Sequence, residues 1–461
     1  MSPVCDNQCM SECLEFQGWE VEERWFCGQD LYLRLVPLDS KASCCGVCGT
    51  VVTWRKGCLP ERSVRHLSQW HRITYVVFSQ RRFLCKKCRK VVTEHLDWIR
   101  PYRRHTVMFE QLCASLCDRI AVTDVALHMK IDKMALYEID AAWIGHRNDD
   151  HRVSLLGIRY IGIDEIMVRR EEAKALVKIP VPIKRHKNKR GAKRRMRKRK
   201  FSRKWVWVVR PRFATIIYDL ETGRILAIEE GRSCKVASRL LRSLGKEVLG
   251  KIEAVCMDMA ACYKKAVKRV LPKVPIVFDR FHVKGYVNEA VEEVRKLAQA
   301  TADTEDRKFI FNQRWLLLKT DPEEHDKWRL DNLFELNKDL ALAYQLKDQF
   351  DSIFTQDNKN TAEKQLNSYI SYCRRSRLEP FRKLAGRLTK WKPYMLNYFD
   401  HPITNGMVEG MNNVVKRVLY RGFGYKNMNY FFGKVRVATG DLPTMVELGV
   451  TIAENKYQKA S

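Results

Sequence analysis

The middle of the chain, from residue 157, alternates hydrophobic and polar positions in the pattern of β-strands. Three strand candidates rich in β-branched and aromatic residues come first: GIRYIGIDEI, KWVWVVRPRFATIIYDL and GRILAIEE. Two helix–strand pairs follow: CKVASRLLRSLGKEVLG with IEAVCMD, and MAACYKKAVKRVL with VPIVFDRFHV. This order predicts an α/β domain with a mixed five-stranded sheet.

Helical periodicity replaces the strand pattern over residues 283–400, where the chain is highly charged and has few Gly or Pro residues. We expect an all-α domain here, inserted between a first part of the core at 151–282 and a second part at 401–461. The order βββαβαβ is that of the ribonuclease H fold. The sequence therefore predicts a ribonuclease H-like core interrupted by a helical insertion.

Residues 106–147 predict three short helices within a domain at 101–150, with Thr123 as the N-cap of the second helix. Their hydrophobic residues have the spacing of a helix-turn-helix, whose last helix enters a major groove: Val125, Ala126, Met134, Leu136 and Ile139. The alternative is a small bundle with a purely structural role.

The charge of the chain indicates its partner. Lys and Arg number 85 against 54 Asp and Glu, a net charge of +31 over 461 residues. This excess favours a polyanion, and we expect double-stranded DNA, although a basic surface without a partner is the alternative. No signal peptide and no apolar run of about 18 residues is found, so we expect a cytoplasmic, nucleoid-associated protein that does not enter a membrane.

A dense basic run lies between the first two strand candidates, at residues 184–204, where 14 of 21 residues are Lys or Arg. Such a run repels itself and should be disordered when free. We expect it to act as a non-specific arm on the DNA backbone, through residues that include Arg194, Arg195, Arg197 and Lys198. The alternative is a solvated loop.

Two C-x₂-C pairs, Cys45 with Cys48 and Cys85 with Cys88, have the spacing of zinc ligands. They predict a structural Zn²⁺ in a zinc-ribbon-like domain at 41–100, and buried free cysteines are the alternative. Four further side chains are candidate substitute ligands: Cys44, Cys58, His66 and His71. The segment 1–40 stays unassigned, as do its cysteines: Cys5, Cys9, Cys13 and Cys27.

Three acidic residues lie at the ends of predicted elements and are candidates for one metal site: Asp164, Asp258 and Glu409. Mg²⁺ is held by a few carboxylates, and two such ions can clamp the oxygens of a phosphodiester displacement. By strand alternation Gly162 shares a face with Asp164 and should leave open space beside it, whereas Glu165 points to the other side.

Glu409 lies near the start of a predicted helix capped by Thr404 or Asn405. Helical spacing aligns Asn405, Glu409, Asn412 and Lys416 on one face. A carboxylate beside an amide and an ammonium suits contact with a metal and a phosphate. The basic residues of this region are predicted to bind DNA: Lys416, Arg417 and Arg421.

Several of these motifs together resemble the DDE transposases of bacterial insertion sequences, specifically the ISL-three group: CGVCG, RRFLCKKC, YIGIDE, MDMAACYKKAV, FDRFHV, RWLLLK, LALAYQLKDQF and TNGMVEGMNNVVKR. The resemblance covers nearly the whole chain. It implies that Asp164, Asp258 and Glu409 are the catalytic acids, with two Mg²⁺ or Mn²⁺ ions per site. Asp279 and His282 resemble a D-x-x-H signature, which implies an accessory role for them and for Asn412.

The resemblance further implies binding to terminal inverted repeats, strand cleavage at the element ends and joining of the 3′-hydroxyl to target DNA. Two ends imply a homodimer or a larger assembly. Two rival functions remain: a nuclease of the same fold that cleaves without joining, and a domesticated DNA-binding regulator with an inactive core.

Overall fold

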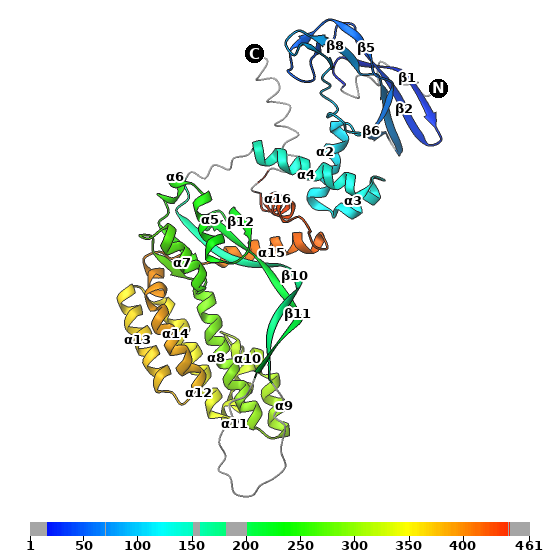
Figure 1. Ribbon diagram of the computed structural model, residues 1–461. Helices are drawn as coiled ribbons and strands as arrows, with labels where there is room; N and C mark the ends of the chain where they lie inside the picture. The colour runs from blue at the N-terminus through cyan, green and yellow to red at the C-terminus, as the bar shows by residue number, and fades with distance from the viewer. Residues whose placement is uncertain (1–15, 70, 151–156, 181–200, 441, 443–461) are drawn as a thin grey trace. The chain divides into compact units, whose positions relative to one another are not determined.

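The computed structural model describes residues 16–69, 71–150, 157–180, 201–440 and 442 (Figure 1). The chain forms two compact units: residues 1–152 with 442–461, and residues 153–441. No helix among the described residues is long and apolar enough to span a membrane.

The N-terminal unit begins with a four-stranded sheet of order β1-β2-β7-β6, formed by β1 (Trp19–Cys27), β2 (Asp30–Pro37), β6 (Arg62–Gln69) and β7 (Arg72–Phe78). β2 and β7 are parallel, whereas the other pairs are antiparallel. Its core packs apolar strand residues such as Leu33 and Val76 against Trp98. Part of the segment left unassigned from sequence therefore supplies two strands of this sheet.

Two smaller sheets carry the cysteine pairs. β3 (Ser43–Cys44) pairs with β4 (Val51–Val52), and β5 (Arg55–Cys58), β8 (Arg81–Cys85) and β9 (Lys90–Thr93) form the second sheet. Cys45 and Cys85 are buried in a small core with Val52, Phe83 and Val92.

Three helices complete the described part of this unit: α2 (Val107–Arg119), α3 (Val122–His128) and α4 (Lys133–Asp150). α3 begins two residues earlier than expected, with Ala121 and not Thr123 at its N-cap. Leu136 and Ile139 are buried as expected. Met134 is 62% exposed, because it lies in the first turn of α4, away from the core of the bundle.

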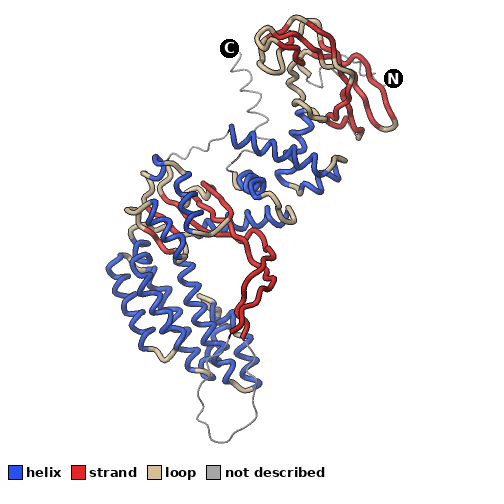
Figure 2. Tube along the Cα trace, in the orientation of Figure 1, coloured by secondary structure: helices blue, strands red, loops and turns tan. Residues whose placement is uncertain are grey.

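The second unit contains the expected mixed five-stranded sheet: β10 (Tyr160–Pro180), β11 (Phe201–Asp219), β12 (Ile225–Glu230), β13 (Ala254–Met257) and β14 (Ile276–Phe278). The strand order is β12-β11-β10-β13-β14. Figure 2 draws these strands in red and the helices in blue. β12, β11 and β10 are mutually antiparallel, whereas β10, β13 and β14 are parallel.

Helices cover both faces of this sheet. One face packs against α5 (Cys234–Ser243) and α7 (Ala261–Val270), which the short α6 (Lys246–Leu249) separates along the chain. The opposite face packs against α15 (Gly406–Arg421) and α16 (Met428–Ala438), through residues such as Ile216, Val415 and Phe431. Segments from both ends of the unit therefore enclose the sheet.

β10 and β11 continue past the sheet as a long two-stranded ribbon, paired as far as Pro180 and Phe201 (Figure 1). The expected strands were shorter, and residues 201–204, assigned from sequence to a disordered run, belong to β11. The alternation of Val206, Trp207 and Val208 extends the strand pattern back toward that run. The rest of the basic run, residues 184–200, lies outside the described residues.

The helical segment contains α8 (Arg280–Thr301), α9 (Thr304–Asn312), α10 (Arg314–Leu318), α11 (Glu324–Leu336), α12 (Lys338–Asp351), α13 (Lys359–Arg375) and α14 (Glu379–Leu396). Short 3₁₀ turns follow α12 and α14, at Ser352–Thr355 and Asn397–Phe399. Its core is continuous with the core beneath the sheet, from Ile161 to Leu396. The insertion is therefore packed as part of the same unit.

Candidate active site

Three aspartates lie at the same level of three neighbouring strands. Ile163 pairs with Met257, and Met257 pairs with Phe278. The next residues, Asp164, Asp258 and Asp279, therefore follow in register, on strands about 4.8 Å apart. In parallel strands, residues in register point to the same face. The sheet itself thus places these acids in a row.

Asp164 is held by two hydrogen bonds. Its Oδ1 accepts from the backbone N–H of Glu165 at 2.8 Å, and its Oδ2 accepts from Asn412 Nδ2 at 2.7 Å. Burial raises the pKa of this carboxyl, although the two hydrogen bonds and the charge of His282 oppose the shift. Asp164 is therefore fixed in orientation and poorly solvated.

Asp258 lies just after β13, where its Oδ1 accepts from the backbone N–H of Ala260 at 2.9 Å. Burial raises the pKa of this carboxyl too, and the negative charge of Asp164 adds to the effect. His282 and Arg232 act in the opposite direction. Two neighbouring carboxyls that are both costly to ionise form a site that a cation would stabilise.

Asp279 precedes α8 and is only 2% exposed. Its Oδ2 lies 2.7 Å from His282 Nδ1, and its Oδ1 accepts from the backbone N–H of Asn405 at 3.4 Å. The hydrogen bond to Asp279 raises the pKa of His282, and the charges of Asp164 and Asp258 act in the same direction. These contacts therefore favour the protonated, positively charged imidazole beside the two carboxylates.

Helix α15 approaches the sheet closely at Gly162. A Cβ at this position would lie 2.7 Å from Leu220 Cδ2, 3.1 Å from Asn405 Oδ1 and 3.2 Å from Val408 Cγ2. The expectation of open space beside Asp164 was therefore wrong, because the glycine admits the helix and not a ligand. This contact lets Asn412 reach both Asp164 and the hydroxyl of Tyr218, which donates to Asn412 Oδ1 at 2.7 Å.

The polar face expected for α15 is divided in the structure. Asn405, at the N-cap, and Asn412 are buried, whereas Glu409 and Lys416 are exposed. The buried face of the helix is centred on Val408, Val415 and Val418, which leaves Glu409 and Lys416 outside the contact.

Glu409 does not join the two aspartates in a cluster of metal-ligand atoms. Within the described part of the chain, only the four thiols of the N-terminal unit form a group of at least three such side chains with all ligand atoms within 4.8 Å of one another. Glu409 is nevertheless carried by the first turn of α15, three residues before the asparagine that contacts Asp164.

Glu165 points away from Asp164, as strand alternation predicts. It accepts a hydrogen bond from Tyr263 at 2.9 Å and pairs with Arg232 at 3.2 Å. These contacts tie β10 to α7 and to the segment after β12.

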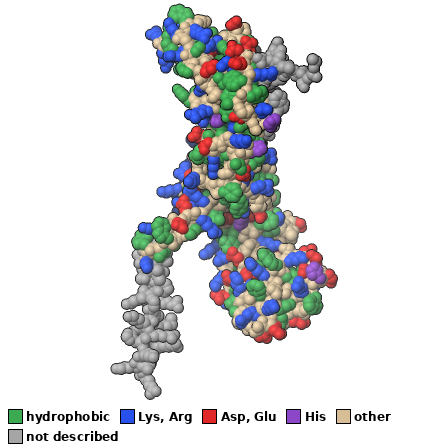
Figure 3. All heavy atoms as spheres, turned by 90° about the vertical axis from the view of Figure 1, so that its right-hand side faces the viewer, with side chains coloured by type: hydrophobic (Ala, Val, Ile, Leu, Met, Phe, Trp, Pro, Cys, Tyr) green, Lys and Arg blue, Asp and Glu red, His purple; other side chains and the backbone are tan. Residues whose placement is uncertain are grey.

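The basic residues expected to bind DNA differ in whether the structure describes them and in how exposed they are. Lys416 and Arg417 are exposed on α15, and Arg421 is half-buried. The four residues of the basic run, Arg194, Arg195, Arg197 and Lys198, lie outside the described residues. On the face in Figure 3, Lys and Arg side chains are scattered among acidic and apolar ones.

The four cysteines of the C-x₂-C pairs come together in the N-terminal unit, with all sulfur atoms within 4.8 Å of one another. Hydrogen bonding with Thr50 lowers the pKa of Cys48 to about 6, whereas hydrogen bonding with Cys48 raises the pKa of Cys88 to about 12. Four thiols this close cannot all ionise unaided, and the donor set fits a tetrahedral Zn²⁺.

The candidate substitute ligands lie outside this cluster. Cys44 is in β3, and Cys58 accepts a hydrogen bond from Arg55. His66 is buried against Thr106, and His71 is exposed. Cys27 is exposed at the end of β1, whereas Cys5, Cys9 and Cys13 lie outside the described residues.

Sequence reasoning gave Asp279 an accessory role but did not identify Tyr218 or a group of arginines beside the sheet. For Asp279 the signal was local, since the apolar runs AVCM and IVF are each followed by an aspartate. Tyr218 and the arginines carried no local signal, because their roles depend on strand pairing.

Comparison with known proteins agrees with these features. Residues 205–435, half of the 461-residue chain, match a family model described as transposase, and residues 94–144 match the helix-turn-helix domain of transposase family ISL3. The chain is 26% identical to the transposase for insertion sequence element IS1001 of Bordetella parapertussis, over 94% of this chain and 98% of that protein. It is 21% identical to the transposase for insertion sequence element IS1557 of Mycobacterium tuberculosis, over 92% and 90% of the two chains. The chain therefore belongs to the ISL3 family of transposases.

Proposed function

We propose that this transposase cleaves DNA at the ends of its insertion sequence and joins the freed 3′-hydroxyl to target DNA by metal-assisted phosphoryl transfer. One observation carries the proposal: Asp164 and Asp258 lie side by side in register, and burial raises the pKa of both. The strand order β12-β11-β10-β13-β14, with its antiparallel and parallel halves, is that of a ribonuclease H-like fold and supports the assignment.

Asp164 and Asp258 would hold Mg²⁺ or Mn²⁺, with Glu409 as the third carboxylate. When bound, two such ions would supply an activated oxygen nucleophile and stabilise the leaving oxygen. The chain's own groups orient the site, since Asn412 and the backbone N–H of Glu165 fix the two oxygens of Asp164. Glu409 would complete the set by approaching from the first turn of α15.

Asp279 and His282 act as positioning residues in this proposal. His282, held by Asp279, would place positive charge near Asp164 and Asp258 when protonated. It would limit repulsion between the carboxylates before a cation binds and would attract the DNA phosphate afterwards. Asp279 is thereby assigned to the histidine and not to the metal.

The N-terminal unit is proposed to recognise the terminal inverted repeats. The first turn of a recognition helix contacts base edges, and Lys133 and Met134 are exposed in the first turn of α4. Zn²⁺ on the four cysteines would fix the small sheets that precede these helices. Since two ends are joined, we propose that at least two copies of the chain act together.

The test uses the full chain and a duplex that carries the element's end. Asp164→Asn and Asp258→Asn should abolish cleavage in Mg²⁺ and in Mn²⁺ while end binding persists. Asp279→Asn should reduce cleavage but leave it measurable. Full strand cleavage by the Asp258→Asn protein would refute the assignment. Joined products in a plasmid target assay distinguish transposition from simple nuclease action.

One observation favours a DNA-binding regulator with an inactive core: the exposed Glu409 is not gathered with the aspartates. In that case wild-type protein would shift end DNA on a gel and would cut none of it in the presence of either metal.

A further inference from the structure

A pocket of about 760 Å³ lies where the five-stranded sheet narrows to the ribbon. β12 ends at Glu230, opposite Ala214 of β11, so the edge of β11 is free of β12 from Phe213 back to Arg210. We call it the arginine pocket and define it by the residues that carry its chemistry: Arg169, Arg210, Arg212, Phe213, Glu230 and Arg232.

A bulge in β10 helps to shape this site. Met167 pairs with Phe213, yet Arg169 pairs with Arg212, so one extra residue is inserted between them. The shift turns Arg169 toward the same strand face as Arg212. Without the bulge, Arg169 would lie on the opposite face.

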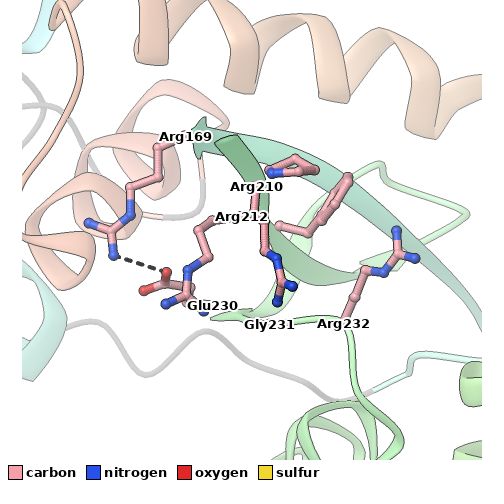
Figure 4. A pocket seen from close by; sticks show the side chains of 8 residues that line it. Arg169, Arg210, Arg212, Glu230, Gly231 and Arg232 are labelled. Carbon is pink, nitrogen blue, oxygen red and sulfur yellow. Dashed lines mark hydrogen bonds and ion pairs between the residues drawn. The ribbon is translucent and has the colours of Figure 1, made fainter. Parts of the chain in front are cut away.

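The charges of the pocket are only partly compensated. Arg169 pairs with Glu230 at 3.2 Å (Figure 4). Arg169 also pairs with Glu171 at 2.8 Å, and Arg212 pairs with the same Glu171 at 2.5 Å. The Nε of Arg169 is buried with no hydrogen-bond partner among the described residues. The backbone of Arg210 pairs with Glu171 in the ribbon, but its side chain is exposed and makes no hydrogen bond or ion pair within the described part of the chain.

Arg232 connects the pocket to the carboxylate site. Its guanidinium lies 4.6 Å from the centroid of the Phe213 ring and pairs with Glu165, which follows Asp164 in the sequence and points to the other side of β10. It also acts electrostatically on Asp258. Arg169 is five residues beyond Asp164 on β10, about 16 Å at 3.3 Å per residue. That distance spans about five nucleotides at a rise of 3.4 Å.

We infer that the arginine pocket binds phosphodiester groups of a DNA strand that leads into the carboxylate site. Guanidinium groups match the geometry of phosphate oxygens and bind them bidentately. Phe213 offers an apolar surface to the sugar or base beside the phosphate. The inference rests on the proposed function only for the identity of the strand.

The test combines two changes that each remove one charge: an uncharged phosphate analogue in the DNA and an uncharged side chain in the protein. Full-length protein is bound, without divalent metal, to end duplexes in which single phosphates are replaced by methylphosphonates. In wild type, one replacement about five nucleotides from the cleaved bond should weaken binding about tenfold. In the Arg210→Gln protein the same replacement should have no further effect, and the salt dependence of binding should fall by about one phosphate contact.

Arg170→Gln is the matched control, because Arg170 is exposed on the same ribbon but does not line the pocket. The Arg170→Gln protein should lose affinity on methylphosphonate replacement as wild type does. The Arg210→Lys protein should recover part of this sensitivity to the replaced phosphate. A second duplex, with the end already joined to target DNA, shows whether the coupled phosphate belongs to the element or to the target. An Arg210→Gln protein with wild-type sensitivity at every phosphate in both duplexes overturns the inference.

The outcome is separable from that of the proposed chemistry. Cleavage is measured in parallel with Mg²⁺. If the effect of the replaced phosphate depends on Arg210 but the protein cuts no DNA, the arginine pocket is supported and the catalytic proposal is refuted. If the protein cuts DNA but no replaced phosphate depends on Arg210, the phosphate-binding role of the pocket is refuted and the catalytic proposal is supported.

Discussion

Replacing Gly162 with alanine would insert a methyl group where α15 meets the sheet. The new Cβ would lie 2.7 Å from Leu220 Cδ2, whereas carbon atoms in contact prefer about 3.5–4.0 Å. A displacement of about 1 Å is therefore required. The side chains of Asn405 and Val408 close the other directions at 3.1 and 3.2 Å, so Leu220 or the start of α15 must move.

Overpacking of this kind costs about 1–3 kcal/mol of stability. For a unit of this size each kcal/mol lowers the melting temperature by about 2–4 °C. Activity should fall further than stability, because α15 carries Asn412, the partner of Asp164. A misplacement near 1 Å in an active site costs about 10²-fold in rate. The α15 atoms at 3.1 and 3.2 Å need to move by only a few tenths of an ångström, so we expect a folded protein whose Mg²⁺-dependent cleavage is reduced by less than this, about 10-fold.

The assay combines thermal unfolding with single-turnover cleavage of an end duplex at a temperature where the variant is folded. Gly285→Ala is the control, since a Cβ at this helical position in α8 meets nothing within 4 Å. It should be stabilised by about 0.5–1 kcal/mol and should cleave as wild type does. A Gly162→Ala protein with unchanged melting and cleavage would show that the close approach of α15 is not needed.

Three further predictions concern other parts of the molecule. Wild-type protein should contain about one equivalent of Zn²⁺. The Cys85→Ser protein should contain no Zn²⁺, and its N-terminal unit should no longer unfold cooperatively. The Cys44→Ser protein should keep the metal, because Cys44 lies outside the cluster. Asn412→Ala should lower cleavage about 10–100-fold with end binding intact, whereas Asn413→Ala, an exposed neighbour, should not; equal activities would contradict the role of the Asn412–Asp164 bond. Burial lowers the pKa of His66 from 6.5 to about 4, so the unfolded chain takes up a proton first as the pH falls. The free energy of unfolding should therefore drop by up to about 3 kcal/mol between pH 6.5 and 4, measured by denaturant titration, and His66→Gln should flatten this part of the profile.

Local patterns in the sequence were enough for much of the fold. The alternation in GIRYIGIDEI and the apolar runs before Asp258 and Asp279 predicted strands that the structure contains. The two C-x₂-C pairs predicted a thiol cluster because ligand spacing within a turn is a local property. Where the feature was contained in about ten consecutive residues, the prediction could be made from sequence.

Features that depend on pairing or packing could not be predicted in this way. The phase of α15 is set by the face that Val408 and Val415 bury, so the exposure of Glu409 needed the structure. The arginine pocket depends on a bulge after Met167 that leaves no mark in the hydrophobic pattern. Gly162 was misread because a strand glycine looks the same whether a ligand or a helix approaches it.

The bond between Asp164 and Asn412 joins residues 248 positions apart, and its consequence concerns synthesis of the protein. At about 5–20 residues per second, a ribosome delivers Asn412 about 12–50 s after Asp164. Throughout that interval β10 exists without its covering helix, and the nascent chain lacks an oriented Asp164. A premature stop anywhere before Asn412 would leave a product with this bond missing. A fully oriented Asp164 is thus available only in chains translated at least as far as Asn412.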